Sequence, residues 1–250
     1  LSVRAFATEE KHDAIWVWLG PEPADPELIP DFSFIDRTKR EARVKGYLNS
    51  EADYRLMVDN IMDLTHADYL HSSSLGGGIN SRAKASVEQA GNSVSITWTA
   101  LDDTLAPLHA QVVPGCSGRG DMLNQVDWFA PGTMRQRLLL ALPGELESNG
   151  MDSVTCHVMT PEREGRTHYF FCHTSDAVSA RPEIGPAIKE ALTGAFAGED
   201  SPMLVAQTQR INGRDFWSMK PAMLPSDKGA VLVRRALDRL IDNEEVEKTP

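Results

Sequence analysis

Apolar and polar residues alternate with a period of two along the middle of the chain. Val94, Ile96 and Trp98 are separated by serine and threonine, and the segment 84–89 before them alternates in the same way. The turn residues Gly91-Asn92 between the two segments predict a β-hairpin. Further strands are predicted where Gly, Pro and Asn interrupt the apolar pattern, over 125–129, 134–142, 152–160 and 167–174. Because the connections are short, we expect an antiparallel sheet.

Two more strands are predicted before this sheet. The first covers residues 14–19, where apolar and aromatic residues are followed by Gly20-Pro21, and we expect it to be buried. The second covers residues 43–49 and leads into Ser50.

The spacing of apolar residues changes to three and four on both sides of the sheet. Tyr54, Met57, Val58 and Ile61 follow this spacing and predict a helix that packs on the sheet, with Ser50 as its N-cap. After the sheet, helices are predicted over 182–196, over 202–211 and from 226 to 241. Strands in the middle with helices before and after them predict an α+β fold in a single domain, residues 1–250.

The composition excludes several classes of protein. At 250 residues with 41% apolar content, the chain can bury a large core. No run approaches ~18 apolar residues, so no membrane span is predicted. The formal net charge of −11 argues against a nucleic-acid-binding surface. The three cysteines form no CxxC pair, which fits a reducing compartment, and we expect a cytoplasmic protein.

Candidate chemistry is concentrated in the pattern Asn60-xx-Asp63-xx-His66-xxxx-His71. Two imidazoles and a distant carboxylate form the ligand set of many mononuclear iron sites. Positions i and i+5 of an ideal helix are about 140° apart, so one ion can hold both histidines only if the helix ends, kinks or bulges between them. The carboxylate of Asp63 is one turn before His66 and could accept its free imidazole N–H. Polar residues inside a helix can also be simply solvated.

The residues alone leave two further questions open. The carboxylate ligand could be Glu199 or Asp200, and an acidic pair between helices is often solvated rather than metal-bound. The Ser- and Gly-rich segment 72–78 lacks the Lys-Ser/Thr of a phosphate-binding loop, and we expect a mobile loop over a pocket mouth.

The pattern from Asn60 to His71 resembles the iron motif of the Rieske-type non-heme iron oxygenases. The asparagine and the flanking residues resemble the branch that contains vanillate O-demethylase and dicamba monooxygenase. The resemblance extends over most of the chain, through 15–21, 56–63, 160–162, 168–171, 199–200 and 227–241. It departs from the family after Asp200, where Ser201-Pro202 replaces a basic residue.

The resemblance implies the fold and the metal site. The fold would be the helix-grip arrangement, an antiparallel sheet around a long helix. His66, His71 and Asp200 would hold a mononuclear Fe(II), Asn60 would lie close to it, and Asp63 would bridge His66 to a cluster-binding histidine of a neighbouring subunit. The chain has no CxH followed by CxxH, so the Rieske domain with its [2Fe–2S] cluster would precede it in a longer protein.

The resemblance also implies the reaction and the partners. The expected reaction is O₂-dependent O-demethylation of a methoxylated aromatic acid such as vanillate, with His157 and Gln136 contacting the substrate. A reductase or ferredoxin would deliver electrons from NAD(P)H, and the subunits would form a homotrimer. The alternatives are ring hydroxylation or N-demethylation by the same iron chemistry, and a metal-free module of the same fold that binds hydrophobic ligands.

Overall fold

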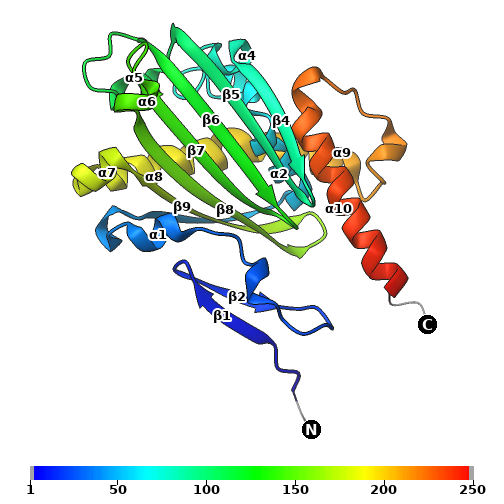
Figure 1. Ribbon diagram of the computed structural model, residues 1–250. Helices are drawn as coiled ribbons and strands as arrows, with labels where there is room; N and C mark the ends of the chain where they lie inside the picture. The colour runs from blue at the N-terminus through cyan, green and yellow to red at the C-terminus, as the bar shows by residue number, and fades with distance from the viewer. Residues whose placement is uncertain (1–2, 248–250) are drawn as a thin grey trace.

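A seven-stranded antiparallel sheet organises the computed structural model, which describes residues 3–247 (Figure 1). Its strand order is β3-β9-β8-β7-β6-β5-β4. The strands are β3 (Val44–Ser50), β4 (Lys84–Ala90), β5 (Ser93–Thr104), β6 (Arg119–Phe129), β7 (Thr133–Ala141), β8 (Met151–Arg163) and β9 (Arg166–Ser175). From β4 to β9 every strand pairs with the next one in sequence, and β3 closes the order beside β9. The alternating pattern and the short connections therefore predicted the sheet correctly.

Helices cover one face of this sheet, which we call the inner face. The helices α2 (Tyr54–Met62), α8 (Gly185–Gly194), α9 (Ser201–Ile211) and α10 (Lys228–Glu247) lie on this side (Figure 1). Trp98, Trp128, Tyr169 and Phe171 point inward from three strands and are buried against the helices, because cross-strand partners share a face. The structure is the predicted α+β domain, with the helix-grip arrangement.

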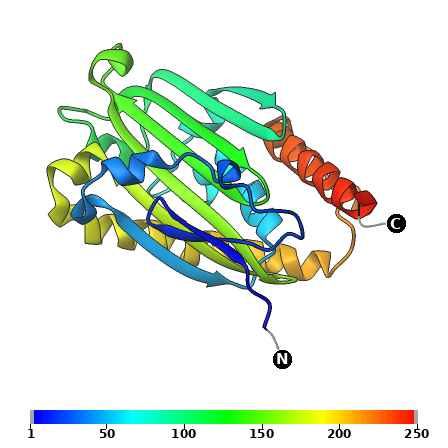
Figure 2. The ribbon, with the colours of Figure 1, turned by 60° about the horizontal axis from the view of Figure 1, so that its bottom comes forward.

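The outer face carries a smaller apolar layer. The helix α1 (Ser33–Arg37) lies over β8 and β9, on the near side of the sheet in Figure 2. Phe32 and Ile35 pack there against Cys156 and Cys172, two directly paired residues of the strands. Both thiols are buried and free, and burial raises their pKa values.

The start of α2 differs from the prediction. Ser50 is the last residue of β3, and the N-cap is Asp53, whose carboxylate accepts a hydrogen bond from the Arg55 N–H. The strand β3 continues through Ser50 before the chain turns. The helix therefore begins later, and the side chain of Asp53 caps it instead.

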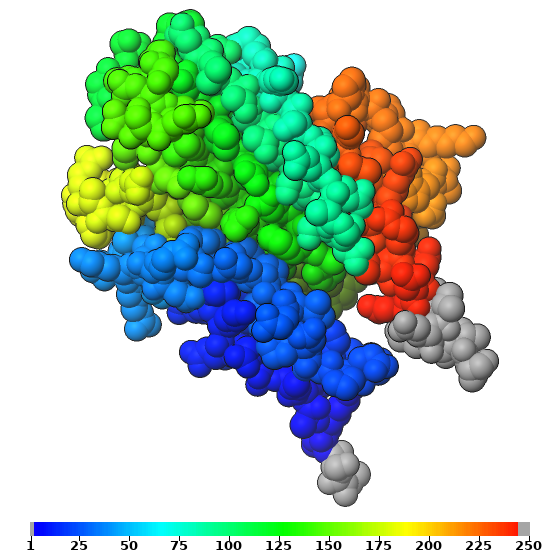
Figure 3. Space-filling view, viewed as in Figure 1, coloured from blue at the N-terminus to red at the C-terminus, as the bar shows by residue number. Residues whose placement is uncertain are grey.

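The predicted strand over residues 14–19 exists but is not buried in the core. It is β2 (Ala14–Trp18), which pairs only with β1 (Ala7–Lys11), and the hairpin projects beside the large sheet (Figures 1 and 3). Ile15 is 74% exposed and Val17 51% exposed. An apolar strand pattern therefore indicated a strand correctly but not what covers it.

Shorter helical segments connect the main elements. They are η1 (Pro26–Leu28), η2 (Arg40–Ala42), η3 (Leu64–His66), α3 (Ala67–Leu70), α4 (Ile79–Arg82), α5 (Pro107–Val112), α6 (Leu146–Asn149), α7 (Asp176–Ala180), η4 (Pro182–Ile184), η5 (Ala195–Asp200), η6 (Trp217–Met219) and η7 (Pro225–Asp227). Within residues 3–247, no helix has both the length and the apolar character needed to cross a bilayer.

Candidate metal centre

The segment that follows α2 brings His66 and His71 to the same side of the chain. The helix α2 ends at Met62, and Asp63 leaves the helical conformation with φ −131° and ψ 92°. The chain then forms the 3₁₀ turn η3 and the single α-helical turn α3, whose C-cap is His71. The imidazole centroids are 5.4 Å apart. The helix breaks before the pair and changes type within it, which overcomes the angular mismatch of an i, i+5 spacing.

Asp200 reaches the same point from a π-helical segment. The helix α8 continues without interruption through η5 (Ala195–Asp200) into α9, with Pro202 in the first turn of α9. Proline has no N–H to donate and would clash with the carbonyl four residues before it in a regular α-helix. The wider π-turns before Pro202 accommodate this residue. The departure from the family pattern at Ser201-Pro202 thus changes the helix type and does not break the helix.

The three side chains converge on one small space. The Asp200 Oδ1 atom is 3.1 Å from His71 Nε2 and 3.5 Å from His66 Nε2. One potential ligand atom from each residue lies within 4.8 Å of the others. Asp200 is only 2% exposed, and its Oδ1 has no hydrogen-bond partner in the structure.

Hydrogen bonds hold the other nitrogen of each imidazole. His66 Nδ1 lies 2.5 Å from the main-chain oxygen of Asp63, and His71 Nδ1 contacts the Glu199 carboxylate. Both partners are acceptors, so each neutral imidazole carries its proton on Nδ1 and directs the lone pair of Nε2 toward Asp200. Three electron pairs then face one another in a buried space, an arrangement that a positive charge between them would stabilise.

Two expectations for this site change. The group that accepts from His66 is the carbonyl of Asp63, not its carboxylate, because Asp63 Oδ1 caps η3 by accepting from the N–H and hydroxyl of Thr65. Glu199 does not compete with Asp200 for the shared space, since its carboxylate binds the outer nitrogen of His71.

The pKa shifts agree with a need for positive charge. Burial disfavours the charged form of Asp200, but the facing imidazoles of His66 and His71 outweigh it and lower the pKa of this carboxyl. Burial also disfavours the charged form of His71, yet the carboxylates of Asp200 and Glu199 raise its pKa. A proton or a metal ion can supply the missing charge. A donor set of two imidazoles and one carboxylate fits Fe(II), with positions left open for other ligands.

Asn60 lies beside this space, and Asp63 follows Asn60 three positions later in the chain. Asn60 and Asp200 line the same pocket, of about 70 Å³, together with Ser50, Tyr169 and Phe196. The described hydrogen bonds of the Asp63 carboxylate all use Oδ1. Its second oxygen has no described hydrogen bond.

The two residues predicted to contact substrate lie on the inner face of the sheet. His157 is 1% exposed, and its Nε2 lies 3.3 Å from Oε1 of Gln136. The hydroxyl of Tyr169 lies 2.8 Å from His157 Nδ1, and Gln136 donates to Asn124. Burial lowers the pKa of His157 to about 3, so the row is uncharged at neutral pH. Phe196 packs against both His157 and Tyr169, and Phe196 and Tyr169 line the same pocket as Asp200.

Sequence reasoning missed three residues of this region. Glu199 was considered only as a ligand, although a carboxylate beside a metal-binding aspartate is a common partner for an imidazole N–H. Tyr169 and Phe196 had no assigned role, because an aromatic residue in a strand or helix is usually part of the core. Tyr169 lies two positions from Phe171 on one face of β9, and that alternation was a usable signal.

Comparisons with known proteins agree with this geometry. Residues 50–243 match the family described as the vanillate O-demethylase oxygenase C-terminal domain. The oxygenase component of chloroacetanilide N-alkylformylase from Rhizorhabdus wittichii is 30% identical over 246 residues, which are 96% of this chain and 69% of that protein. The oxygenase component of dicamba O-demethylase from Stenotrophomonas maltophilia is 30% identical over 242 residues, which are 96% of this chain and 71% of that protein.

Solved structures give the same result. The crystal structure of dicamba monooxygenase bound to 3,6-dichlorosalicylic acid superimposes with a TM-score of 0.89 at 28% identity, covering all of this chain and 73% of that one. The structure bound to dicamba gives 0.87 at 29% identity, again over the whole of this chain and 72% of that one. A further structure of the same enzyme contains non-heme iron and dicamba. The chain therefore belongs to the vanillate O-demethylase oxygenase C-terminal domain family, and it is the catalytic part of a Rieske-type non-heme iron oxygenase.

Proposed function

We propose that His66, His71 and Asp200 bind one Fe(II) ion, and that the protein uses it to demethylate a methoxylated aromatic substrate, with an aromatic acid such as vanillate as the first candidate. The observation that carries the proposal is the convergence of two Nε2 atoms and an unpartnered carboxylate oxygen in a buried space. The names of the relatives, which include O-demethylase oxygenase components for dicamba and vanillate, support the reaction class.

The residues of this chain would hold and orient the ion. Iron held there would supply O₂ activation, with one oxygen atom entering the methyl C–H bond and the other leaving as water. The main-chain oxygen of Asp63 and the carboxylate of Glu199 fix the two imidazoles so that Nε2 faces the ion. The hydroxylated methyl group then leaves as formaldehyde, and the phenol remains.

Two electrons from NAD(P)H balance this reaction. They would come through a reductase or ferredoxin and a [2Fe–2S] Rieske cluster carried by an upstream domain, which contains the ligands absent from this chain. Asp63 would bridge His66 to a cluster-binding histidine of a neighbouring subunit in a homotrimer. In support, the backbone of Asp63 contacts His66, and its second carboxylate oxygen is outside the described hydrogen bonds.

Substrate would bind between the metal centre and the inner face of the sheet. His157 and Gln136 present neutral hydrogen-bonding groups there, within an otherwise apolar layer. Asn60 would lie near the iron without firm bonding. Phe196 contacts His157 and lines the pocket beside Asp200, so it would be a wall of this substrate space.

The test is metal binding by this chain under anaerobic conditions. We expect about one Fe(II) per chain, and His66→Ala or His71→Ala should each abolish binding. His168→Ala is the matched control, because His168 is on the outer face of β9, away from the candidate metal centre. A wild-type chain without affinity for iron would instead support a metal-free module that binds hydrophobic molecules.

Product analysis separates the reactions that one iron site can support. The full-length oxygenase with its reductase should release formaldehyde from a methoxybenzoate in step with NAD(P)H consumption. A cis-diol product would indicate ring dihydroxylation. N-dealkylation is the second candidate, favoured by the chloroacetanilide relative, and it would release an aldehyde from an amide substrate but not from an aryl ether.

A further inference from the structure

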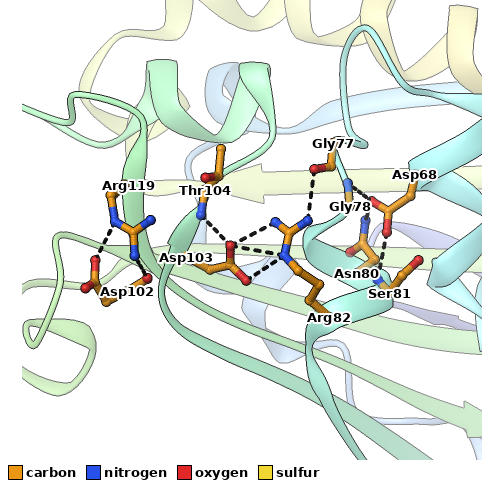
Figure 4. Close-up of polar contacts among 10 residues, drawn as sticks. All are labelled: Asp68, Gly77, Gly78, Asn80, Ser81, Arg82, Asp102, Asp103, Thr104 and Arg119. Atoms are coloured by element: carbon orange, nitrogen blue, oxygen red, sulfur yellow. Dashed lines mark hydrogen bonds and ion pairs between the residues drawn. The ribbon is translucent and has the colours of Figure 1, made fainter.

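Asp68 lies between the two candidate histidine ligands, and the mechanism above gives it no role. Its carboxylate accepts three hydrogen bonds from residues ten to thirteen positions later. Oδ1 accepts from the Gly78 N–H at 2.9 Å and from the Asn80 amide at 3.2 Å, and Oδ2 accepts from the Ser81 N–H at 2.7 Å (Figure 4). A side chain on the ligand-bearing turn thus holds the segment 72–82.

The same segment also holds the end of that turn at His71. The main-chain oxygen of His71 accepts from the N–H groups of Ser74, Leu75 and Gly76, at 2.9 to 3.1 Å. The helix α3 has only four residues, and so short a helix is not stable without external contacts. The angle between the two imidazoles therefore depends on what fastens α3 from outside.

The glycines of the segment are required by this contact. A Cβ atom on Gly76 would lie 2.3 Å from the Ala67 carbonyl oxygen and 2.8 Å from the Asp68 Cα atom. Gly77 and Gly78 have φ values of +119° and +89°, which L-residues rarely adopt. These glycines, which suggested a mobile loop, thus allow the segment to pack closely on α3. The segment does not line the pocket beside Asp200.

The far end of the segment is fixed to the sheet. Arg82 binds the Asp103 carboxylate of β5 at 2.8 to 3.2 Å, with the single Nε–H shared between both oxygens and Nη2 donating to Oδ1. Its Nη1 donates to the Gly77 carbonyl at 3.4 Å (Figure 4). A continuous series of contacts therefore links α3 to β5, through Asp68, the glycines and Arg82.

We infer that Asp68 is a positioning residue for the metal centre, which holds α3 in the conformation that directs both imidazoles at Asp200. This inference rests on the proposed iron site. Without the carboxylate, the segment 72–82 would hold α3 through the His71 carbonyl and the packing of Gly76, and the imidazoles would sample more orientations. The energetic cost would appear as weaker and less uniform metal binding.

The experiment measures Fe(II) affinity of this chain by anaerobic competition with a chelator, in wild type and three variants. Asp68→Ala removes all three acceptor contacts and should weaken binding by about tenfold or more. Asp68→Asn keeps one acceptor oxygen and should lie between that variant and wild type. Asp102→Asn is the control with unchanged affinity, because its carboxylate pairs only with the exposed Arg119 among the described contacts (Figure 4).

A second measurement distinguishes positioning from general stability. The EPR spectrum of the nitric oxide adduct of the Fe(II) chain reports the ligand geometry, and we expect Asp68→Ala to broaden it relative to wild type. If Asp68→Ala and Asp68→Asn lower the melting temperature but keep wild-type affinity and spectrum, Asp68 is only structural and the inference is wrong. If the wild-type chain itself binds no iron, the proposed function fails and this inference fails with it.

Discussion

The sheet and the helices around the inner layer contribute different kinds of polar group. Along the regular pairing of β3 to β9, the side chains that face inward are apolar or neutral, and Asn124, Gln136 and His157 are the central polar ones. The charged groups that face the same layer come from helices, as in Glu199 and Asp200.

The outer face of the same strands has the opposite character. Asp127 accepts hydrogen bonds from Arg135 and Ser95, and Arg137 pairs with Asp152 on the next strand. Asp127 is buried but paired with Arg135, and solvent can screen the half-exposed Arg137 and Asp152, whereas a charge on the inner face would be buried without a partner. The sheet therefore contributes a neutral inner face, while the helices contribute the charge at the candidate metal centre.

The comparison is tested most strongly by a charge placed on the inner face. Gln136→Lys should lower the free energy of unfolding by on the order of 3 kcal/mol or more, because an ammonium there has no acid partner on the sheet. Gln125→Lys is the matched control on the outer face, next to Asp127, and should change stability by less than about 0.5 kcal/mol. Urea unfolding of both variants measures the difference, and equal losses would contradict the contrast between the faces.

The charge supplied by the helices can be removed singly at Glu199. Glu199→Gln keeps the shape of the side chain but weakens its hold on His71, so Fe(II) affinity should fall by about 10- to 100-fold. Anaerobic chelator competition measures the change. Glu190→Gln, an exposed residue of α8, serves as the control. Unchanged affinity in Glu199→Gln would show that the His71 contact does not orient a ligand.

The neutrality of the inner face predicts a pH dependence of stability. The pKa of His157 is lowered by burial to about 3, below the value of about 6.5 expected in the unfolded chain. The unfolded state therefore binds more protons, and stability falls as pH decreases from about 6.5 toward 3, by about 1.4 kcal/mol per pH unit for this one group.

His157→Gln should remove that share of the slope when unfolding free energies are measured between pH 6.5 and 4.5. The other buried histidines contribute equally in both proteins, so their effect cancels. A His157→Gln slope equal to that of wild type would mean that His157 is charged in the folded state.

The smallest effect is expected on the outer face. Arg137→Gln breaks the ion pair between Arg137 and Asp152. Both side chains are half-exposed, so the free energy of unfolding should fall by less than about 1 kcal/mol. The difference from wild type should disappear in about 1 M salt, where exposed charges are screened. A larger loss that persists in salt would mean that the outer face also depends on specific charge pairing.

The sequence determined the sheet and the main helices, and its resemblance to a known family indicated the candidate ligands. A two-residue period continues only where strands have one face in the core, so the order of elements could be predicted from the pattern alone. The spacing of His66 and His71 was a weak signal by itself, and the resemblance of the pattern from Asn60 to His71 to the family's iron motif indicated both as ligands. The exposure of Ile15 could not be predicted, since an apolar side chain does not show what covers it.

Tertiary structure decided which atoms meet. Asp200 and Glu199 are adjacent in sequence, yet the π-turns of η5 direct one carboxylate into the space between the imidazoles and the other to the outer nitrogen of His71. Asp63 accepts through its backbone because its carboxylate caps the following turn. Asp68 finds its partners ten and more positions away only after the segment 72–82 has folded back. Such contacts depend on side-chain directions and on distances between remote segments, which residue spacing does not encode.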